Sequence, residues 1–163
     1  GTTQADADYK LRVNGKTFID GILNVGEIIE RITVDSVTVL GTVSSVNIDL
    51  SDNNVYYYTS SATGNWTINF RASNLQSLDT FMREGETLTV AVMTTQGGTA
   101  FYNTTVQIDS SPVNIFEYGD LAITEGNTSG IDMYTYVIVK KSNAGTIDDR
   151  FTVLRSLSQY TQQ

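Results

Sequence analysis

Short runs of β-forming residues alternate along most of this chain with small and polar turn residues. From Ile28 onward, stretches rich in Val, Thr, Ile and Tyr are interrupted by Gly, Asn, Asp and Ser, and the single proline, Pro112, leaves the strands free to pair. Regular turns between short strands are typical of antiparallel two-sheet folds. We therefore predict a mainly β domain, an antiparallel β-sandwich (jelly-roll-like), with strands over residues 32–40, 45–50, 55–60, 66–70, 87–93, 100–108, 113–116, 134–140 and 151–156.

One segment, residues 73–84, breaks the β pattern. Ser73 and Gln76 have the spacing of a capping box, and apolar side chains recur after them at helical intervals. Gly85 follows at the position of a left-handed C-terminal cap. We predict one short helix here, lying on a sheet or closing one end of the sandwich.

Two junctions between predicted strands have the composition of tight turns. Residues 51–54 read Ser-Asp-Asn-Asn and residues 95–98 read Thr-Gln-Gly-Gly. Because Gly and Asn tolerate the backbone angles of two-residue turns, we predict a hairpin at each. The oxygen-bearing side chains of residues 49–54 would also suit a hard cation such as calcium, but the full acidic loop of a calcium site is missing. We favour the turn and predict no metal.

Residues 1–30 carry a β pattern of their own, with an Asn-Gly hairpin signal at residues 14–15. An isolated ribbon of two or three strands is marginal in water, so this segment is expected to bury its apolar side against copies of itself. We predict a β stalk, the oligomerisation segment, over residues 1–30 and a β-sandwich knob over residues 31–163. The five apolar side chains expected to seal a homotrimer are Leu11, Val13, Phe18, Ile22 and Val25.

Composition excludes several classes of function. The formal net charge is −8, which argues against a partner that is a nucleic acid or an anionic membrane surface. No apolar run approaches the roughly eighteen residues of a membrane-spanning helix, so no membrane insertion is expected. The chain has no Cys and no His, so thiolate nucleophiles, disulfides, imidazole bases and zinc sites cannot be built within it. We expect no cofactor.

Aromatic residues provide the first candidates for ligand contact. Residues 56–58 are three consecutive tyrosines on a predicted strand, where successive side chains face opposite sides. Tyr56 and Tyr58 therefore share one face and Tyr57 occupies the other, so Tyr57 is a candidate for an exposed contact. Trp66 is either a core residue or a platform for a sugar ring, and packing is the favoured interpretation.

Two polar, glycine-containing loops beside aromatic residues provide the second set of candidates. They cover residues 60–65 and 117–130, and the latter is long for a hairpin connection. Binding residues concentrate on loops held by a rigid scaffold, so we predict receptor contacts at Tyr118 and Asp120. The alternative is that both loops only connect strands.

Two stretches near the N-terminus resemble stalk segments of phage tail fibres. Residues 9–15 read Tyr-Lys-Leu-Arg-Val-Asn-Gly, and residues 21–26 read Gly-Ile-Leu-Asn-Val-Gly. The body is similar to a domain of tail-fibre and virion structural proteins from tailed phages of marine bacteria and cyanobacteria. That family commonly has Asp-Gly where this chain has Asp109-Ser110, so no shared role is carried over to that turn. The stretches that carry the likeness are residues 67–71, 88–92, 99–102, 106–109 and 151–154.

The resemblance implies a structural and attachment role and brings no catalytic residue. We therefore predict a non-enzymatic virion component, a tail-fibre or appendage fragment that forms a homotrimer and presents its knob to a host surface glycan or receptor. One alternative is a monomeric carbohydrate-binding module, which the mass in solution would distinguish. Another is a polysaccharide depolymerase acting through paired carboxylates. None of the 18 acidic residues stands out as such a pair, because the candidates all lie in predicted turns.

Overall fold

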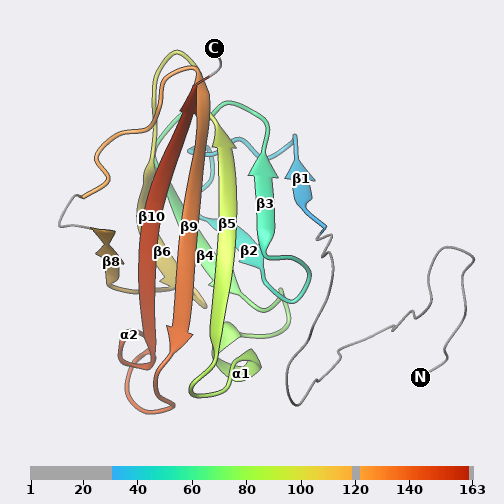
Figure 1. The fold of residues 1–163 in the computed structure, drawn as a ribbon. Helices are drawn as coiled ribbons and strands as arrows, with labels where there is room; N and C mark the ends of the chain where they lie inside the picture. The colour runs from blue at the N-terminus through green and yellow to red at the C-terminus, as the bar shows by residue number, and fades with distance from the viewer. Residues whose placement is uncertain (1–30, 119–121, 162–163) are drawn as a thin grey trace, which may run out of the picture. The chain divides into compact units, whose positions relative to one another are not determined.

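The computed structural model describes residues 31–118 and 122–161, which belong to one unit of the chain, residues 31–163. In these residues ten strands form two sheets that enclose a hydrophobic core (Figure 1). The predicted mainly β sandwich is confirmed. The larger sheet has the order β1 (Thr33–Asp35), β3 (Val55–Tyr58), β5 (Thr87–Thr95), β9 (Gly130–Lys140), β10 (Phe151–Thr161), β8 (Ile115–Glu117). The smaller sheet has the order β2 (Val46–Asp49), β4 (Trp66–Arg71), β6 (Asn103–Ile108), β7 (Ser111–Pro112).

The chain alternates between the two sheets from β1 to β6, so each strand from β1 to β5 is followed by one in the facing sheet. Five of the eight strand pairings in the described residues are parallel, and four of these follow from the alternation. The antiparallel, jelly-roll-like pairing that we predicted is wrong for these five pairs and holds for β5–β9, β9–β10 and β6–β7. A parallel pair needs a crossover connection. For the four parallel pairs among β1 to β6 the strand in the facing sheet supplies it, whereas β8 is joined to β10 through β9 of the same sheet.

Both predicted hairpins are connections between the sheets. Residues 51–54 lead from β2 to β3, and residues 95–98 lead from β5 toward β6. The tight hairpin of the structure joins β6 to β7, where Asp109 and Ser110 have φ angles of 51° and 67°. Turn residues permit a sharp reversal of the chain, but they do not determine which sheet the next strand enters.

Two single-turn helices occupy the described residues, where one over residues 73–84 was predicted. The first, α1 (Leu78–Phe81), begins after Ser77, whose side chain caps it. Ser73 does not form the predicted cap, because it pairs in an isolated β-bridge instead. The second, α2 (Ile147–Arg150), leads directly into β10 and was not predicted.

Aromatic side chains fill the centre of the core. Trp66 packs edge-on against Tyr134, with ring centroids 5.6 Å apart, and Phe70 packs similarly against Tyr136 at 5.0 Å. Such pairs add about 0.5–1.5 kcal/mol beyond the burial of their area. The alternation of buried residues along β9 follows the period of two that a strand imposes, so the larger sheet has one face in the core and one face outside.

A buried lysine ties both helices to the larger sheet. Lys140 at the end of β9 is 2% exposed; its ammonium lies 3.0 Å from a carboxylate oxygen of Asp79 and donates to the Met82 carbonyl oxygen at 3.1 Å. Arg150 of α2 pairs with the other Asp79 oxygen at 2.6 Å. Burial alone would raise the pKa of Asp79, but hydrogen bonds from Lys140 and Arg150 outweigh it and hold that pKa below its usual value.

Candidate functional site

Three connections meet at the end of the sandwich where β3, β5 and β8 finish. The Ala62 amide donates to the Thr95 carbonyl oxygen at 3.1 Å, and the Ser129 amide donates to that of Gly97 at 2.8 Å. The connection after β5 therefore lies between the two loops that we predicted as binding loops, residues 60–65 and 117–130. The structure places both predicted loops at the same end of the molecule, apart from residues 119–121, which are not described.

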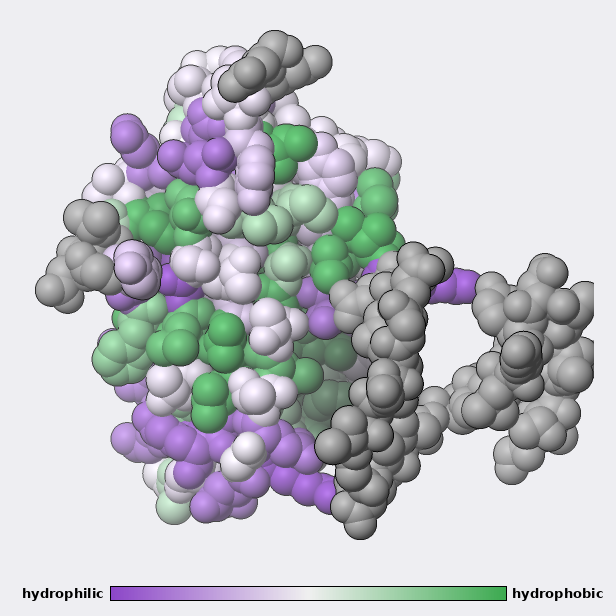
Figure 2. Space-filling model, in the orientation of Figure 1, coloured by the Kyte–Doolittle hydropathy of each residue, from purple (hydrophilic) through white to green (hydrophobic). Residues whose placement is uncertain are grey.

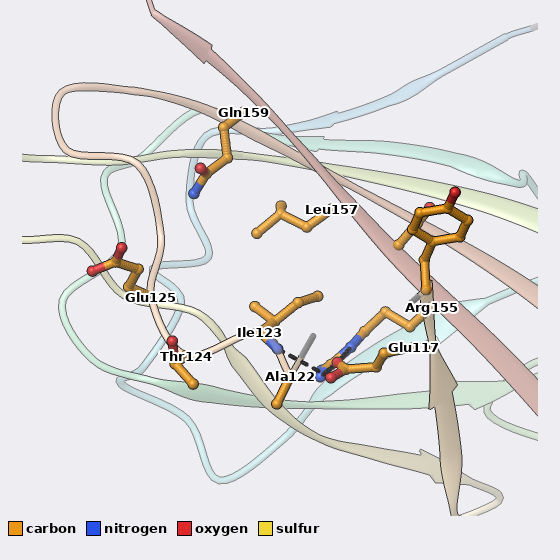
Figure 3. Close-up of a pocket in the computed structure, with 10 residues that line it drawn as sticks. Glu117, Ala122, Ile123, Thr124, Glu125, Arg155, Leu157 and Gln159 are labelled. Atoms are coloured by element: carbon orange, nitrogen blue, oxygen red, sulfur yellow. Dashed lines mark hydrogen bonds and ion pairs between the residues drawn. The ribbon is translucent and has the colours of Figure 1, made fainter. Parts of the chain in front are cut away.

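A cavity of about 360 Å³ opens beneath the connection between β8 and β9 (Figure 3). Residues 122–125 form one wall, and inward-pointing residues of β10 form another. Figure 3 shows Glu117 and Arg155 at one side of the cavity, with Gln159 and Glu125 toward the other. Ten of the described residues line the cavity: Glu117, Tyr118, Ala122, Ile123, Thr124, Glu125, Arg155, Ser156, Leu157 and Gln159.

An ion pair between Arg155 and Glu117 fixes the connection that covers the cavity. The Arg155 Nε donates to Glu117 Oε1 at 2.8 Å, and Nη2 donates to the same oxygen. The other carboxylate oxygen, Oε2, accepts from the Ile123 amide at 3.0 Å. Both oxygens of Glu117 are thus engaged in holding structure. Because the side chain of Arg155 is only 4% exposed, losing either partner would leave a buried charge without its counterpart.

Asn103 connects this ion pair to the aromatic core. Arg155 Nη1 donates to the Asn103 backbone oxygen at 2.6 Å and to its Oδ1 at 2.9 Å. The Tyr136 hydroxyl donates to the same Oδ1 at 3.1 Å. The backbone N–H of Asn103 donates to the Tyr134 hydroxyl at 3.3 Å. Burial raises the pKa of both tyrosines, so they remain neutral hydrogen-bonding groups. This network holds the cavity floor rigidly against the core.

Asp132 anchors the far end of the same connection. It is fully buried, and its Oδ2 accepts from Gln96 Nε2 at 3.0 Å and from the Asn127 amide at 3.1 Å. Its Oδ1 has no hydrogen-bond partner among the described residues, nor does the hydroxyl of Thr94, the residue opposite it on β5. Burial raises the pKa of Asp132. A Cβ at Gly126 would lie 2.7 Å from Asp132 Oδ2, so only glycine allows this approach.

The predicted contact residues are placed very differently from one another. Tyr118 is 87% exposed and lines the cavity. Trp66 is 2% exposed in the core, so the interpretation of Trp66 as a sugar platform is wrong. Tyr57 is half-buried on the outer side of the larger sheet and away from the cavity. Asp120 and the five predicted oligomerisation residues lie outside the described residues.

The residues that the sequence analysis missed are Asn103 and Arg155. Both are polar residues at inward positions of strands, and both are buried. In β10, Arg155 follows Phe151 and Val153 at a period of two. A charged residue that continues an apolar, inward-facing series was the signal available, because such a residue must find a partner in the core.

The candidate cation motif around Asp49 has ordinary structural roles. Asp49 pairs with Arg71 at 2.5 Å, and Asp52 accepts from Ser51 at 3.3 Å. Within residues 31–118 and 122–161, no group of three or more acidic side chains is placed to hold a metal ion. In the same part of the chain, no helix is long and apolar enough to cross a membrane.

Comparisons with known proteins identified no relative of this chain. A scan against models of known protein families gave no match for the chain, and searches of curated proteins and of solved structures gave none either.

Proposed function

We propose that the protein is a non-enzymatic attachment module, a tail-fibre or appendage fragment of a phage virion that works as a homotrimer. The observation that carries the binding role is the open cavity beneath the connection from β8 to β9, a connection that Arg155 and Glu117 hold against the core. The virion and the trimer are supported by the resemblance of residues 9–15 and 21–26 to fibre stalks. A trimer would multiply a weak contact made by each copy into firm adhesion.

The cavity lining favours an uncharged sugar as the ligand. Its volume of about 360 Å³ is at the lower end of the roughly 300–1,000 Å³ usual for small-molecule sites. Gln159 and Thr124 offer hydrogen-bonding groups, while Leu157 and Tyr118 offer apolar surface. Because Glu117 neutralises Arg155, the remaining charge among the described residues of the lining is the carboxylate of Glu125. That negative charge disfavours acidic sugars.

The engaged state of Glu117 favours binding over hydrolysis. A glycosidase needs one carboxyl group to transfer a proton and a second one to act as nucleophile or base. Both Glu117 oxygens already accept hydrogen bonds, from Arg155 and from the Ile123 amide. A binding role requires only that the lining be rigid and correctly shaped, which these bonds provide.

The test is a glycan array followed by titration of the best neutral glycan against wild type and three variants. We expect Tyr118→Ala and Gln159→Ala to weaken binding by tenfold or more, because each removes one contact from the lining. Leu75→Ala is the matched control, since Leu75 is 92% exposed and lies outside the cavity lining. Unchanged affinity in both cavity variants would place the binding site elsewhere, and release of oligosaccharide by the pure protein would favour the depolymerase.

A further inference from the structure

The outer face of the larger sheet carries no charged side chain. We define this outer face as the outward-pointing residues of β1, β3, β5, β8, β9 and β10, the set that includes Tyr57, Met93, Met133 and Leu154. The charged residues of these strands, among them Asp132 and Arg155, point inward. In Figure 2 hydrophobic and near-neutral colours lie over the middle of β5, β9 and β10, while strongly hydrophilic residues gather toward the end that carries α1 and α2 and again near the opposite end.

The absence of charged side chains makes this face unusual in such an acidic protein. The chain has a formal net charge of −8, so two copies repel each other when charged surfaces approach. The outer face is a broad surface where two copies can meet without placing like charges together. Residues 1–30 fit it less well, because they include Lys10, Arg12 and Glu27 among other charged residues, which would find no counter-charge there.

The outer face is also large enough to support association. At about 3.3 Å per residue and about 4.8 Å between strands, the six strands cover roughly 650 Å² in projection. A standard specific interface buries about 800 Å² on each partner, and side chains add area to a flat projection. The scale of the face therefore matches a stable contact between two proteins.

The shape of the face offers both projections and hollows. Phe116 and Tyr160 are 61% and 53% exposed. Beside Phe116, a hollow of about 380 Å³ lies over Val137 and Leu154. A second hollow, of about 440 Å³, lies at the other end of the face between Tyr57 and Tyr160. Two copies can pack together when a projection on one copy fits a hollow on the other. This face carries both, because protruding aromatic residues lie next to apolar hollows.

We propose that the outer face packs against a second copy of this chain. The knob then contributes an interface of its own, separate from any that residues 1–30 form. The inference does not rest on the glycan site, because the titration of Tyr118→Ala and Gln159→Ala can fail while the copies still associate. In the proposed homotrimer the outer faces would lie toward the neighbouring copies, leaving the loop end of each knob free.

The test uses the full chain and two kinds of variant. Leu154→Asp and Tyr160→Asp place a carboxylate on the face at positions exposed enough to leave the fold intact, and circular dichroism checks that fold. Leu75→Asp is the control with the same change of charge away from the face. We expect sedimentation to show assembled wild type and Leu75→Asp, and at least tenfold weaker association of the two face variants.

Cysteine crosslinking supplies a second readout. The chain has no Cys, so a single introduced cysteine can form a disulfide only with another copy. Ser158→Cys lies on the outer face, and we expect mild oxidation to link it efficiently into dimers, whereas Leu75→Cys links poorly. A monomeric wild type at about 100 µM would overturn the proposal. The proposal would also be overturned if Leu154→Asp assembled like wild type and Ser158→Cys formed no link between copies. That result would mean that another segment, such as residues 1–30, covers the face.

Discussion

Gly41 and Gly64 lie backbone against backbone where two connections cross at the loop end of the sandwich. A Cβ added to Gly41 would lie 2.3 Å from the Gly64 backbone nitrogen, closer than atoms can approach. The neighbouring Thr63 amide donates to the Leu40 carbonyl oxygen at 2.9 Å. The connection from β1 to β2 is thereby fastened to the connection from β3 to β4, which includes the predicted loop of residues 60–65.

Gly41→Ala should therefore be far more damaging than a glycine substitution without such a neighbour. Gly41 and Gly85 have similar positive φ angles, 89° and 86°, but a Cβ at Gly85 meets nothing within 4 Å. We expect Gly85→Ala to cost about 1–2 kcal/mol for the left-handed backbone alone. Gly41→Ala adds the overlap with Gly64, and urea unfolding should show at least twice the loss. Equal losses would mean that the two connections separate easily.

The Arg155 network should be worth much more than an ion pair near the surface. Arg155→Met leaves Glu117 without its partner, and breaking a buried pair costs about 3–5 kcal/mol. The matched control is Arg150→Met, because Arg150 is 28% exposed in its pair with Asp79 and such pairs contribute about 1 kcal/mol or less. Hydrogen exchange at the Ile123 amide should also accelerate in Arg155→Met alone. Similar unfolding midpoints for the two variants would argue against a network that holds the cavity.

The alternation along single strands could be predicted from the sequence. Tyr56 and Tyr58 point inward and Tyr57 points outward, as a period of two requires. The partners of each strand could not be predicted, because residues 51–54 have the same composition whether they close a hairpin or lead across to the other sheet. The choice between the two depends on contacts made far along the chain, such as those of β3 with both β1 and β5.

The candidate site was predictable only in part for the same reason. Tyr118 could be found because it lies in a long polar loop, and its exposure follows from local sequence. Arg155 gave no local sign of its partners, since Glu117 is 38 residues away and Asn103 is 52 residues away. Hydrogen bonds between such distant residues form only after the sheets have assembled, and no pattern along the chain specifies them.

Ser110→Gly should stabilise the protein. Asp109 and Ser110 both have positive φ angles in the β6–β7 turn, and a non-glycine residue in this region is strained by about 1–2 kcal/mol. Part of that gain is lost to the greater freedom of glycine in the unfolded chain, so we expect a net gain of about 0.5–1 kcal/mol. Asp109 should be kept, because its carboxylate accepts from the Leu78 and Asp79 amides at 2.7 and 3.0 Å.

The control for that prediction is the neighbouring residue. Ser111 begins β7 and is not among the residues with positive φ. Ser111→Gly therefore relieves no strain and should lower the free energy of unfolding by about 0.5–1 kcal/mol. Thermal unfolding of the two single variants should move in opposite directions. A parallel loss in both would show that the backbone of Ser110 is not strained.

Two carboxylates, those of the buried Asp132 and the partly buried Asp79, should respond to pH with opposite signs. Burial raises the pKa of Asp132 above its ordinary value of 3.8, so the folded state favours its protonated form. Stability from this group is complete below about pH 3.8 and is lost as the pH rises through the raised pKa. For Asp79 the pKa is lowered in the folded state, so its contribution is present above pH 3.8 and is lost as the pH falls through the lowered value.

Asp132→Asn and Asp79→Asn should separate these two effects. At pH 7 Asp132→Asn removes a buried charge while its side-chain oxygen can still accept from Gln96, so we expect it to be more stable than wild type. That advantage should shrink as the pH falls through the raised pKa of Asp132, because the wild-type carboxyl group then becomes protonated itself. Asp79→Asn should be less stable than wild type at pH 7, because Lys140 loses its counter-charge, and the deficit should also narrow in acid. Urea unfolding at several pH values measures both differences. A pH-independent advantage of Asp132→Asn would mean that burial does not control the ionisation of Asp132.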